Sequence, residues 1–122
     1  MAALHVDADR LKYNGRERMA RLEGNVRLRD RDMELTTPSL DYDMRARKAV
    51  YLNGGRIVSR SEGNTLTSQA GTYYAGIRKF VFSRNVQLQH PERSITSDTM
   101  HYVTATGVSE FYGPTTITKA AR

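Results

Sequence analysis

Apolar and polar residues alternate with a period of two along much of the chain. Two sets show the pattern clearly: Ala20, Leu22, Val26 and Leu28, and then Phe80, Phe82, Val86 and Leu88. This alternation is typical of β-strands with one buried face and not of helices. Turn-forming sequences mark the expected chain reversals at Asn14-Gly15, Asp30-Arg31-Asp32 and Pro91-Glu92-Arg93.

The chain contains four copies of one short segment, and each copy ends in a tyrosine. The copies are Val6–Tyr13, Leu35–Tyr42, Leu66–Tyr73 and Ile95–Tyr102, and their tyrosines are 29, 31 and 29 residues apart. A nearly constant period indicates a repeat architecture. We therefore predict one domain over residues 4–119, with repeats of about 30 residues at approximately 6–32, 33–63, 64–92 and 93–119.

The second half of each unit repeats as well. Nine residues after each tyrosine stands another large apolar residue: Leu22, Tyr51, Phe82 or Phe111. Pairs typical of turns come shortly after these residues: Gly24-Asn25, Gly54-Gly55, Arg84-Asn85 and Gly113-Pro114. An insertion in the second copy leaves the alignment of residues 53–57 open. Each unit is expected to be a β-meander with two long arms.

Leu35 and Leu40 are five residues apart, an odd step that would place them on opposite faces of a regular strand. The same step recurs in all four copies, which predicts a bulge or bend that returns both residues to one interior. Pro38 has no backbone N–H and fits such a corner. The sequence thus predicts an all-β fold of bent, stacked antiparallel strands around a trough.

The apolar residues of the repeats are expected to point into this trough. They are Leu11, Tyr13, Leu22, Val26, Leu28, Leu35, Leu40, Tyr42, Tyr51, Leu66, Tyr73, Phe80, Phe82, Val86, Leu88, Ile95, Met100, Tyr102, Phe111 and Ile117. The alternative interpretation is that the same side chains fill a closed, dry core. Strand packing with the hydroxyl at a rim would equally explain the aligned tyrosines.

The chain is basic, with 19 Lys and Arg against 13 Asp and Glu and a net charge of +6. Such a charge suits an anionic partner: nucleic acid, a membrane surface or a phosphorylated lipid. A simple solvated face is an open alternative, because the cations are spread singly: Arg10, Lys12, Arg21, Arg27, Arg29, Arg45, Lys48, Arg56, Arg78 and Arg93. No nucleic acid partner is expected, because the aromatic residues share the parity of the aliphatic ones and should point inward.

Residue types and spacing do not indicate an enzyme, a metal site or a cofactor. The chain has no cysteine, and its three histidines do not fall in pairs on one face near a carboxylate: His5, His90 and His101. The conceivable acid–base pairs lie at outward or turn positions: Asp41 with Asp43, Asp7 with Asp9, and Glu23 with Glu110. The first five residues lack the pattern of a signal peptide, and no run approaches the ~18 apolar residues of a membrane span.

Two consecutive stretches, Leu22–Leu28 and Met33–Tyr42, resemble the LptA/OstA domain family, which also includes LptC and the amino-terminal part of LptD. The shared pattern is Gly-Asn-Val, an alternating strand, and a strand that ends in Leu-x-Tyr; the resemblance covers roughly residues 4–119. It implies an open β-jellyroll in the Gram-negative periplasm, with the leader peptide absent from this chain. The implied partners are lipopolysaccharide, whose acyl chains would lie in the groove, and related jellyroll domains of the transport machinery.

The expected role is a non-enzymatic transport bridge, either a protein by itself or one domain of a longer chain. The repeats would leave unpaired strands near Val6–Tyr13 and near Thr115–Lys119, which predicts head-to-tail assembly with like domains or a homo-oligomer. The alternative is a structural or surface β-repeat, an adhesin or a carbohydrate-binding sheet, with a closed core and no lipid. Two residues depart from the repeat pattern: Arg84 replaces a turn glycine, and Gly71 replaces a large apolar residue.

Overall fold

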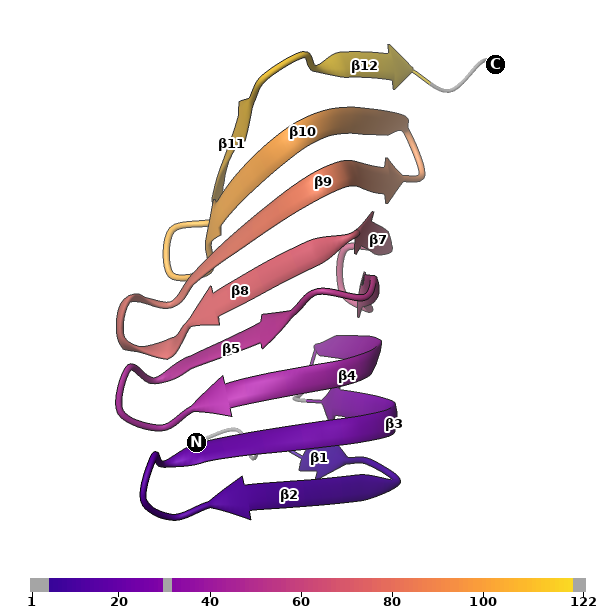
Figure 1. The fold of residues 1–122 in the computed structure, drawn as a ribbon. Helices are drawn as coiled ribbons and strands as arrows, with labels where there is room; N and C mark the ends of the chain where they lie inside the picture. The colour runs from indigo at the N-terminus through magenta and orange to yellow at the C-terminus, as the bar shows by residue number, and fades with distance from the viewer. Residues whose placement is uncertain (1–4, 30–31, 120–122) are drawn as a thin grey trace.

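The computed structural model describes residues 5–29 and 32–119, and nearly all regular structure in them is β-strand (Figure 1). The strands are β1 His5–Asp7, β2 Arg10–Asn14, β3 Met19–Arg29, β4 Met33–Asp43, β5 Lys48–Tyr51, β6 Gly55–Ser59, β7 Asn64–Ser68, β8 Ala70–Tyr74, β9 Lys79–His90, β10 Arg93–Val103, β11 Val108–Tyr112 and β12 Thr116–Lys119, with a 3-10 turn, η1, at Ala75–Ile77. The start of the chain and the reversal expected at residues 30 and 31 lie outside the described residues. The predicted fold class, an all-β open β-jellyroll of stacked antiparallel strands, is confirmed.

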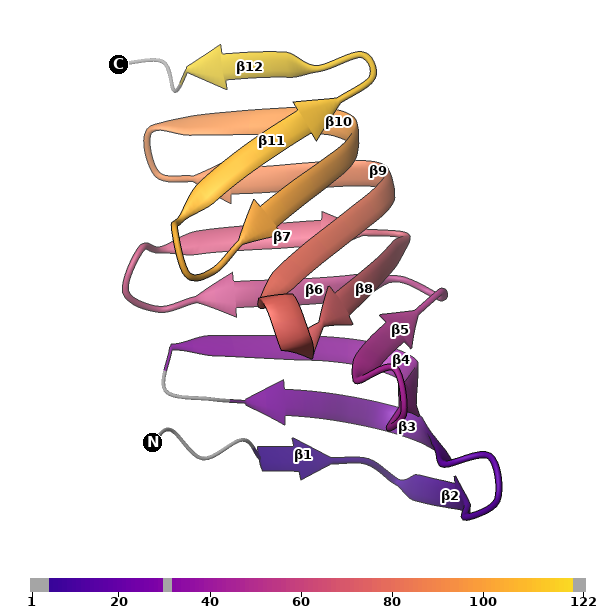
Figure 2. The same cartoon turned by 90° about the vertical axis from the view of Figure 1, so that its left-hand side faces the viewer.

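The sheet is folded into two arms that share four long strands. The long strands β3, β4, β9 and β10 run through both arms, as their curvature in Figure 1 shows. The first arm adds β2, β5, β8 and β11 to them, and the second arm adds β1, β6, β7 and β12. Figure 2 shows the two sets of short strands running in different directions. Each expected two-armed unit is therefore present, and the two arms enclose the interior.

One ladder of cross-strand partners crosses the whole second arm. In order, its members are Val6, Leu28, Leu35, Ile57, Leu66, Leu88, Ile95 and Ile117. This pairing resolves the register that the sequence left open at residues 53–57, because Ile57 lies between Leu35 and Leu66. Leu28, Ile57, Leu88 and Ile117, one from each repeat, thus share one row.

The aligned tyrosines form a second ladder across the first arm. In order, its members are Tyr13, Ala20, Tyr42, Ala49, Tyr73, Phe80, Tyr102 and Ser109. Large and small side chains alternate up to Tyr73, whereas Tyr73, Phe80 and Tyr102 are three aromatic residues in succession. Cross-strand neighbours on one face pack directly against each other, so this order decides where the interior is full and where it is open.

Two of the turn-like pairs do not turn the chain. Gly24-Asn25 lies inside β3 opposite Pro38 alone, and Arg84-Asn85 lies inside β9 opposite Asp98 alone. All four residues have positive φ, between 47° and 79°. These pairs are β-bulges, so the turns expected there are wrong. Ladder pairing resumes on both sides, and two left-handed residues bend the strand instead of ending it.

The bulges mark a line that we call the corner, where one arm passes into the other. Gly54 and Gly113, also with positive φ, separate β5 from β6 and β11 from β12 along the same line. The bend predicted between Leu35 and Leu40 is confirmed, although the extra residue belongs to the partner strand β3. Pro38, opposite the bulge, needs no ladder donor there.

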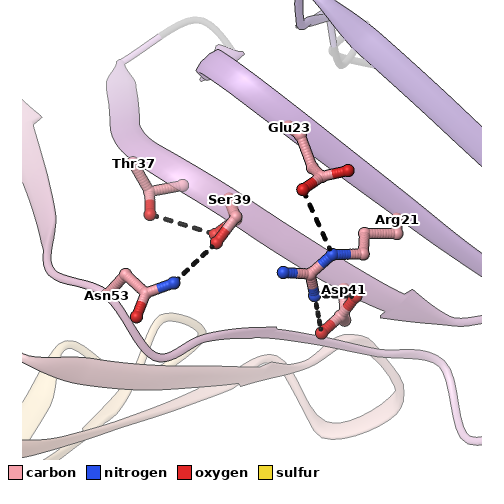
Figure 3. A network of polar contacts seen from close by, with 6 residues as sticks. All are labelled: Arg21, Glu23, Thr37, Ser39, Asp41 and Asn53. Carbon is pink, nitrogen blue, oxygen red and sulfur yellow. Dashed lines mark hydrogen bonds and ion pairs between the residues drawn. The ribbon is translucent and has the colours of Figure 1, made fainter.

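A buried hydroxyl stands at the corner in three of the four repeats: Thr37, Ser68 and Ser97. The Thr37 hydroxyl donates to the carbonyl of Gly54 at 2.8 Å and to that of Ser39 at 3.1 Å. Because the bend interrupts regular ladder pairing, carbonyl groups at the corner need partners from side chains. In Figure 3 Thr37 and Ser39 lie beside Asn53, whose amide donates to the Ser39 hydroxyl at 3.0 Å.

We expect Thr37→Val to lower the free energy of unfolding by about 1–3 kcal/mol, because it leaves buried carbonyl groups without a donor. Thr36→Val is the matched control, since Thr36 is the exposed neighbour on the same strand. Urea denaturation of both variants measures the difference. Equal stability of the two would show that the corner hydroxyl is dispensable.

Candidate functional site

A cavity of about 500 Å³ lies between the two arms, in the part of the stack formed by the first two repeats and β8. Its lining is Val6, Ala20, Leu22, Leu28, Met33, Leu35, Leu40, Tyr42, Ala49, Tyr51, Ile57, Gly71, Thr72, Tyr73, Ala75, Phe80 and Thr104. No charged side chain is part of this lining. Such a surface favours hydrocarbon over any charged or metal-bound group.

The tyrosine ladder explains why the cavity lies where it does. Ala20 and Ala49 alternate with Tyr42 and Tyr73 in this ladder, and all four residues line the cavity. The small side chains leave space that two more aromatic rings would fill. The alternation of apolar and polar residues could not locate this space. It indicates which face a side chain lies on, and it does not distinguish a small inward side chain such as Ala from a large one such as Tyr.

Beyond Tyr73 the interior is filled. The Phe80 ring lies 4.4 Å from that of Tyr73 and 5.3 Å from that of Phe82, centroid to centroid. Phe82, Val86 and Met100 are each at most 3% exposed. The open part of the interior therefore ends at this aromatic cluster, and the interior between β9 and β10 around Phe82, Val86 and Met100 is packed.

The predicted groove residues occupy four kinds of environment. Eight line the cavity: Leu22, Leu28, Leu35, Leu40, Tyr42, Tyr51, Tyr73 and Phe80. Eight pack in or against the core without lining it: Val26, Leu66, Phe82, Val86, Leu88, Met100, Tyr102 and Phe111. Ile95 is half-buried, and three are exposed on edge strands: Leu11, Tyr13 and Ile117.

Several lining residues were missed by the sequence interpretation: Val6, Ala20, Met33, Ala49, Ile57, Gly71, Thr72, Ala75 and Thr104. Ala20 already shared the inward parity, and Val6 was the first residue of the first repeat. Ile57 fell in the unaligned insertion. Ala75 and Thr104 lie in hairpins, where alternation gives no signal.

Tyr51 crosses the interior between two glycines. A Cβ at Gly55 or at Gly71 would collide with its ring. The Tyr51 hydroxyl forms a 2.6 Å hydrogen bond with Ser68 Oγ, which itself donates to the carbonyl of Ala70. Burial raises the pKa of Tyr51, and the bond to Ser68 opposes that rise. Gly71 departs from the repeat pattern because the Tyr51 ring fills the space of the missing side chain.

Three of the candidate acid–base residues, Asp41, Glu23 and Asp7, lie beside arginines; Figure 3 shows Asp41 and Glu23 with Arg21. Arg21 Nη1 binds both oxygens of Asp41, at 2.9 and 2.8 Å, and Arg21 Nε lies 3.7 Å from Glu23. Asp7 pairs with Arg29 at 3.1 Å. These carboxylates neutralise arginines on the outer faces, an arrangement that requires no catalytic role.

The histidines lie apart from the cavity lining as well. The His101 ring packs on Tyr112 at 4.8 Å, and burial together with the charge of Lys79 lowers its pKa against an opposing effect of Glu110. Within residues 5–29 and 32–119, no three His, Cys, Asp or Glu residues are grouped as a metal site would need. In the same residues, no helix has the length and hydrophobicity needed to cross a membrane.

Comparisons with known proteins agree with this architecture. A family model described as OstA-like protein matches residues 2–98. No curated protein sequence matches the chain. Among solved structures, it is similar to LptH of Pseudomonas aeruginosa, the LptA homologous periplasmic component of the conserved lipopolysaccharide transport device. The TM-score is 0.79 at 11% identity, covering 92% of this chain and 83% of LptH. At this identity the likeness shows a shared fold.

We expect Gly71→Ala to destabilise the protein by about 1–3 kcal/mol, because the new methyl group meets the buried Tyr51 ring. Gly76→Ala is the control, since a Cβ there meets nothing within 4 Å. In a Tyr51→Leu background the cost of Gly71→Ala should shrink, which a double-mutant cycle from urea denaturation measures. An unchanged cost in that background would contradict the proposed collision.

Proposed function

The chain belongs to the OstA-like protein family, and from this membership together with the apolar cavity we propose that it is a periplasmic lipopolysaccharide transport domain. In this proposal the cavity holds acyl chains of the lipid. The observation that carries it is the lining without charged groups, inside a fold shared with a periplasmic transport component. The domain acts as a carrier surface and performs no chemistry of its own.

Burial energies are sufficient for this task. Each methylene removed from water contributes about 0.8 kcal/mol, so a chain of about a dozen carbons gains on the order of 10 kcal/mol. An apolar cavity can therefore compete with a bilayer for the chains. Such burial is non-directional, so net movement requires an energy-coupled partner elsewhere in the transport machinery.

Head-to-tail assembly with like domains is the second part of the proposal. In the described residues, β1 and β2 pair only with β3, while β11 and β12 pair only with β10. Each arm has eight strands of alternating direction, so a translated copy would continue the antiparallel order. The second-arm ladder ends in the exposed side chains of Val6 and Ile117, which a neighbouring copy would cover.

The second candidate function is a structural β-repeat without a lipid ligand. The packed aromatic cluster around Phe80 and Phe82 favours it, because Phe82, Val86 and Met100 are almost fully buried in this half of the interior. The cavity in the first half favours the lipid carrier. Mass spectrometry of protein purified from a host with an outer membrane distinguishes the two, since the carrier should retain acylated glycolipid.

Filling the cavity should remove lipid binding. We expect Ala49→Phe to reduce retained glycolipid at least about tenfold, because the ring occupies the space between Tyr42 and Tyr73. Val50→Phe is the control, since Val50 is the next residue of β5 and points to the outer face. Mass spectrometry and thermal unfolding are measured for both. Equal retention by two folded variants would contradict the cavity as the lipid site.

Breaking one edge should prevent assembly. We expect Ile117→Pro to remove a ladder donor and an exposed apolar side chain from β12 while leaving the domain folded. Ile117→Val is the control that keeps both. Light scattering across a wide concentration range should show association for Ile117→Val and its loss for Ile117→Pro. A wild-type protein that stays monomeric and binds no related domain would contradict this part of the proposal.

A further inference from the structure

The hairpins at the free end of the first arm form one continuous row, which we call the hairpin row. It consists of Asn14–Met19, Asp43–Lys48, Tyr74–Lys79 and Val103–Val108, whose end residues pair across the strands between them. The stacked loops stand on the left side of Figure 1. Backbone hydrogen bonds link each hairpin to the next, so the row is a single ordered ridge.

Three of these links repeat one geometry. The amide of Met44 donates to the carbonyl of Arg18 at 2.9 Å, and that of Ala75 donates to Arg47 at 2.9 Å. The amide of Thr104 donates to the carbonyl of Arg78 at 3.0 Å. An arginine therefore stands at the same joint of three successive hairpins.

Most of the net charge of the chain lies in this row. It holds seven cations, Arg16, Arg18, Arg45, Arg47, Lys48, Arg78 and Lys79, against two carboxylates, Glu17 and Asp43. The difference is five of the net +6 charges. At the free end of the second arm, the hairpins Ser59–Asn64 and His90–Arg93 each carry one arginine and one glutamate. The two rims of the opening thus differ in charge.

The carboxylates of the row are engaged by the turns themselves. Glu17 Oε1 accepts from the Asn14 side chain at 3.0 Å, and Asp43 Oδ1 accepts from the amides of Arg45 and Ala46 at 3.0 Å. Among the described residues, ion pairs within 4.0 Å involve arginines outside the row: Arg21, Arg27, Arg29 and Arg60. Arg45 Nη2 also donates to the carbonyl of Arg16 at 3.2 Å. The cations of the row thus have no ion pair among the described residues and are available to an external anion.

The backbone at the joints adds a second observation. Arg18, Arg47 and Arg78 have φ of 55°, 54° and 51°, a region that favours glycine, and Gly107 holds the corresponding place in the fourth hairpin with φ of 74°. Non-glycine residues in this region are uncommon, because the backbone conformation costs them more free energy than it costs glycine. Three guanidinium groups are thus kept where glycine would fit the backbone better.

The row borders the cavity. Ala75 and Thr104, the two donors at the Arg47 and Arg78 joints, both line it. Tyr73 and Phe80, which line it too, precede and follow the third hairpin. A molecule with hydrocarbon in the cavity can therefore place a polar group against these arginines.

We propose that the hairpin row binds the phosphate groups of the headgroup whose acyl chains occupy the cavity; this inference rests on the proposed function. Neighbouring strands are about 4.8 Å apart, so arginines of successive hairpins are separated by about 10 Å along the stack. A headgroup with two phosphates contacts two hairpins at once. Guanidinium groups suit phosphate because their N–H donors match its oxygens in pairs.

The test compares two amphiphiles with identical acyl chains, one with a phosphorylated and one with an uncharged sugar headgroup, in fluorescence displacement from the purified protein. The wild type should bind the phosphorylated form about tenfold more tightly at low ionic strength, and salt should reduce this preference. The triple variant Arg18→Gly, Arg47→Gly and Arg78→Gly should lose the preference and still bind the uncharged form. Its backbone already favours glycine at each site, so it should remain folded.

Arg84→Gly is the matched control, because Arg84 has φ of 67° at the corner, away from the row. It should keep the preference for phosphate. Equal loss in Arg84→Gly, or no preference in the wild type, overturns the row as a phosphate site. Tighter binding of a single-stranded oligonucleotide than of the phosphorylated amphiphile overturns it in favour of nucleic acid. Failure of both amphiphiles to bind the wild type contradicts the proposed function itself.

Discussion

The rest of this structure depends on one constraint, that every long strand bends at the same line without losing its partners. Two left-handed residues in β3 and two in β9 provide the bend, opposite a single residue of the neighbouring strand. Buried hydroxyls at Thr37, Ser68 and Ser97 bind carbonyl groups that the bend leaves outside the ladders. With straight strands the repeats would form an open sheet whose apolar face was exposed to water.

The bend turns one apolar face into an interior, and the side chains along each ladder then decide how full it is. Alternating Tyr and Ala leave a cavity at Ala20 and Ala49, whereas Phe80 and Phe82 close it farther along the stack. The sheet does not close on itself, so in the described residues the end strands β1, β2, β11 and β12 each pair on one side only. The bend accounts for the apolar site, and the open sheet accounts for edges that other strands can extend.

Charged residues are balanced on the outer faces of the sheet and unbalanced at the hairpin row. Arginines on the outer faces of the sheet, such as Arg21 beside Asp41 and Arg29 beside Asp7, are balanced by carboxylates across a strand. At the hairpin row the two carboxylates accept hydrogen bonds from their own turns, and among the described residues no cation of the row forms an ion pair within 4.0 Å. The basic composition therefore belongs mainly to one rim and not to the whole surface.

The strands, the repeats, the all-β fold and the inward parity follow from the sequence alone, because alternation and spacing are local properties that recur in each copy. The sequence also located the bend between Leu35 and Leu40. Three outcomes became known from the folded chain: Gly24-Asn25 is a bulge, Ile57 joins the second-arm ladder, and Leu11 and Ile117 are exposed. The folded structure also distinguishes the inward residues that line the cavity from those that belong to the packed core. These outcomes depend on which strands become neighbours and which lie at an edge. The residues of a single strand do not indicate which strands it will pair with.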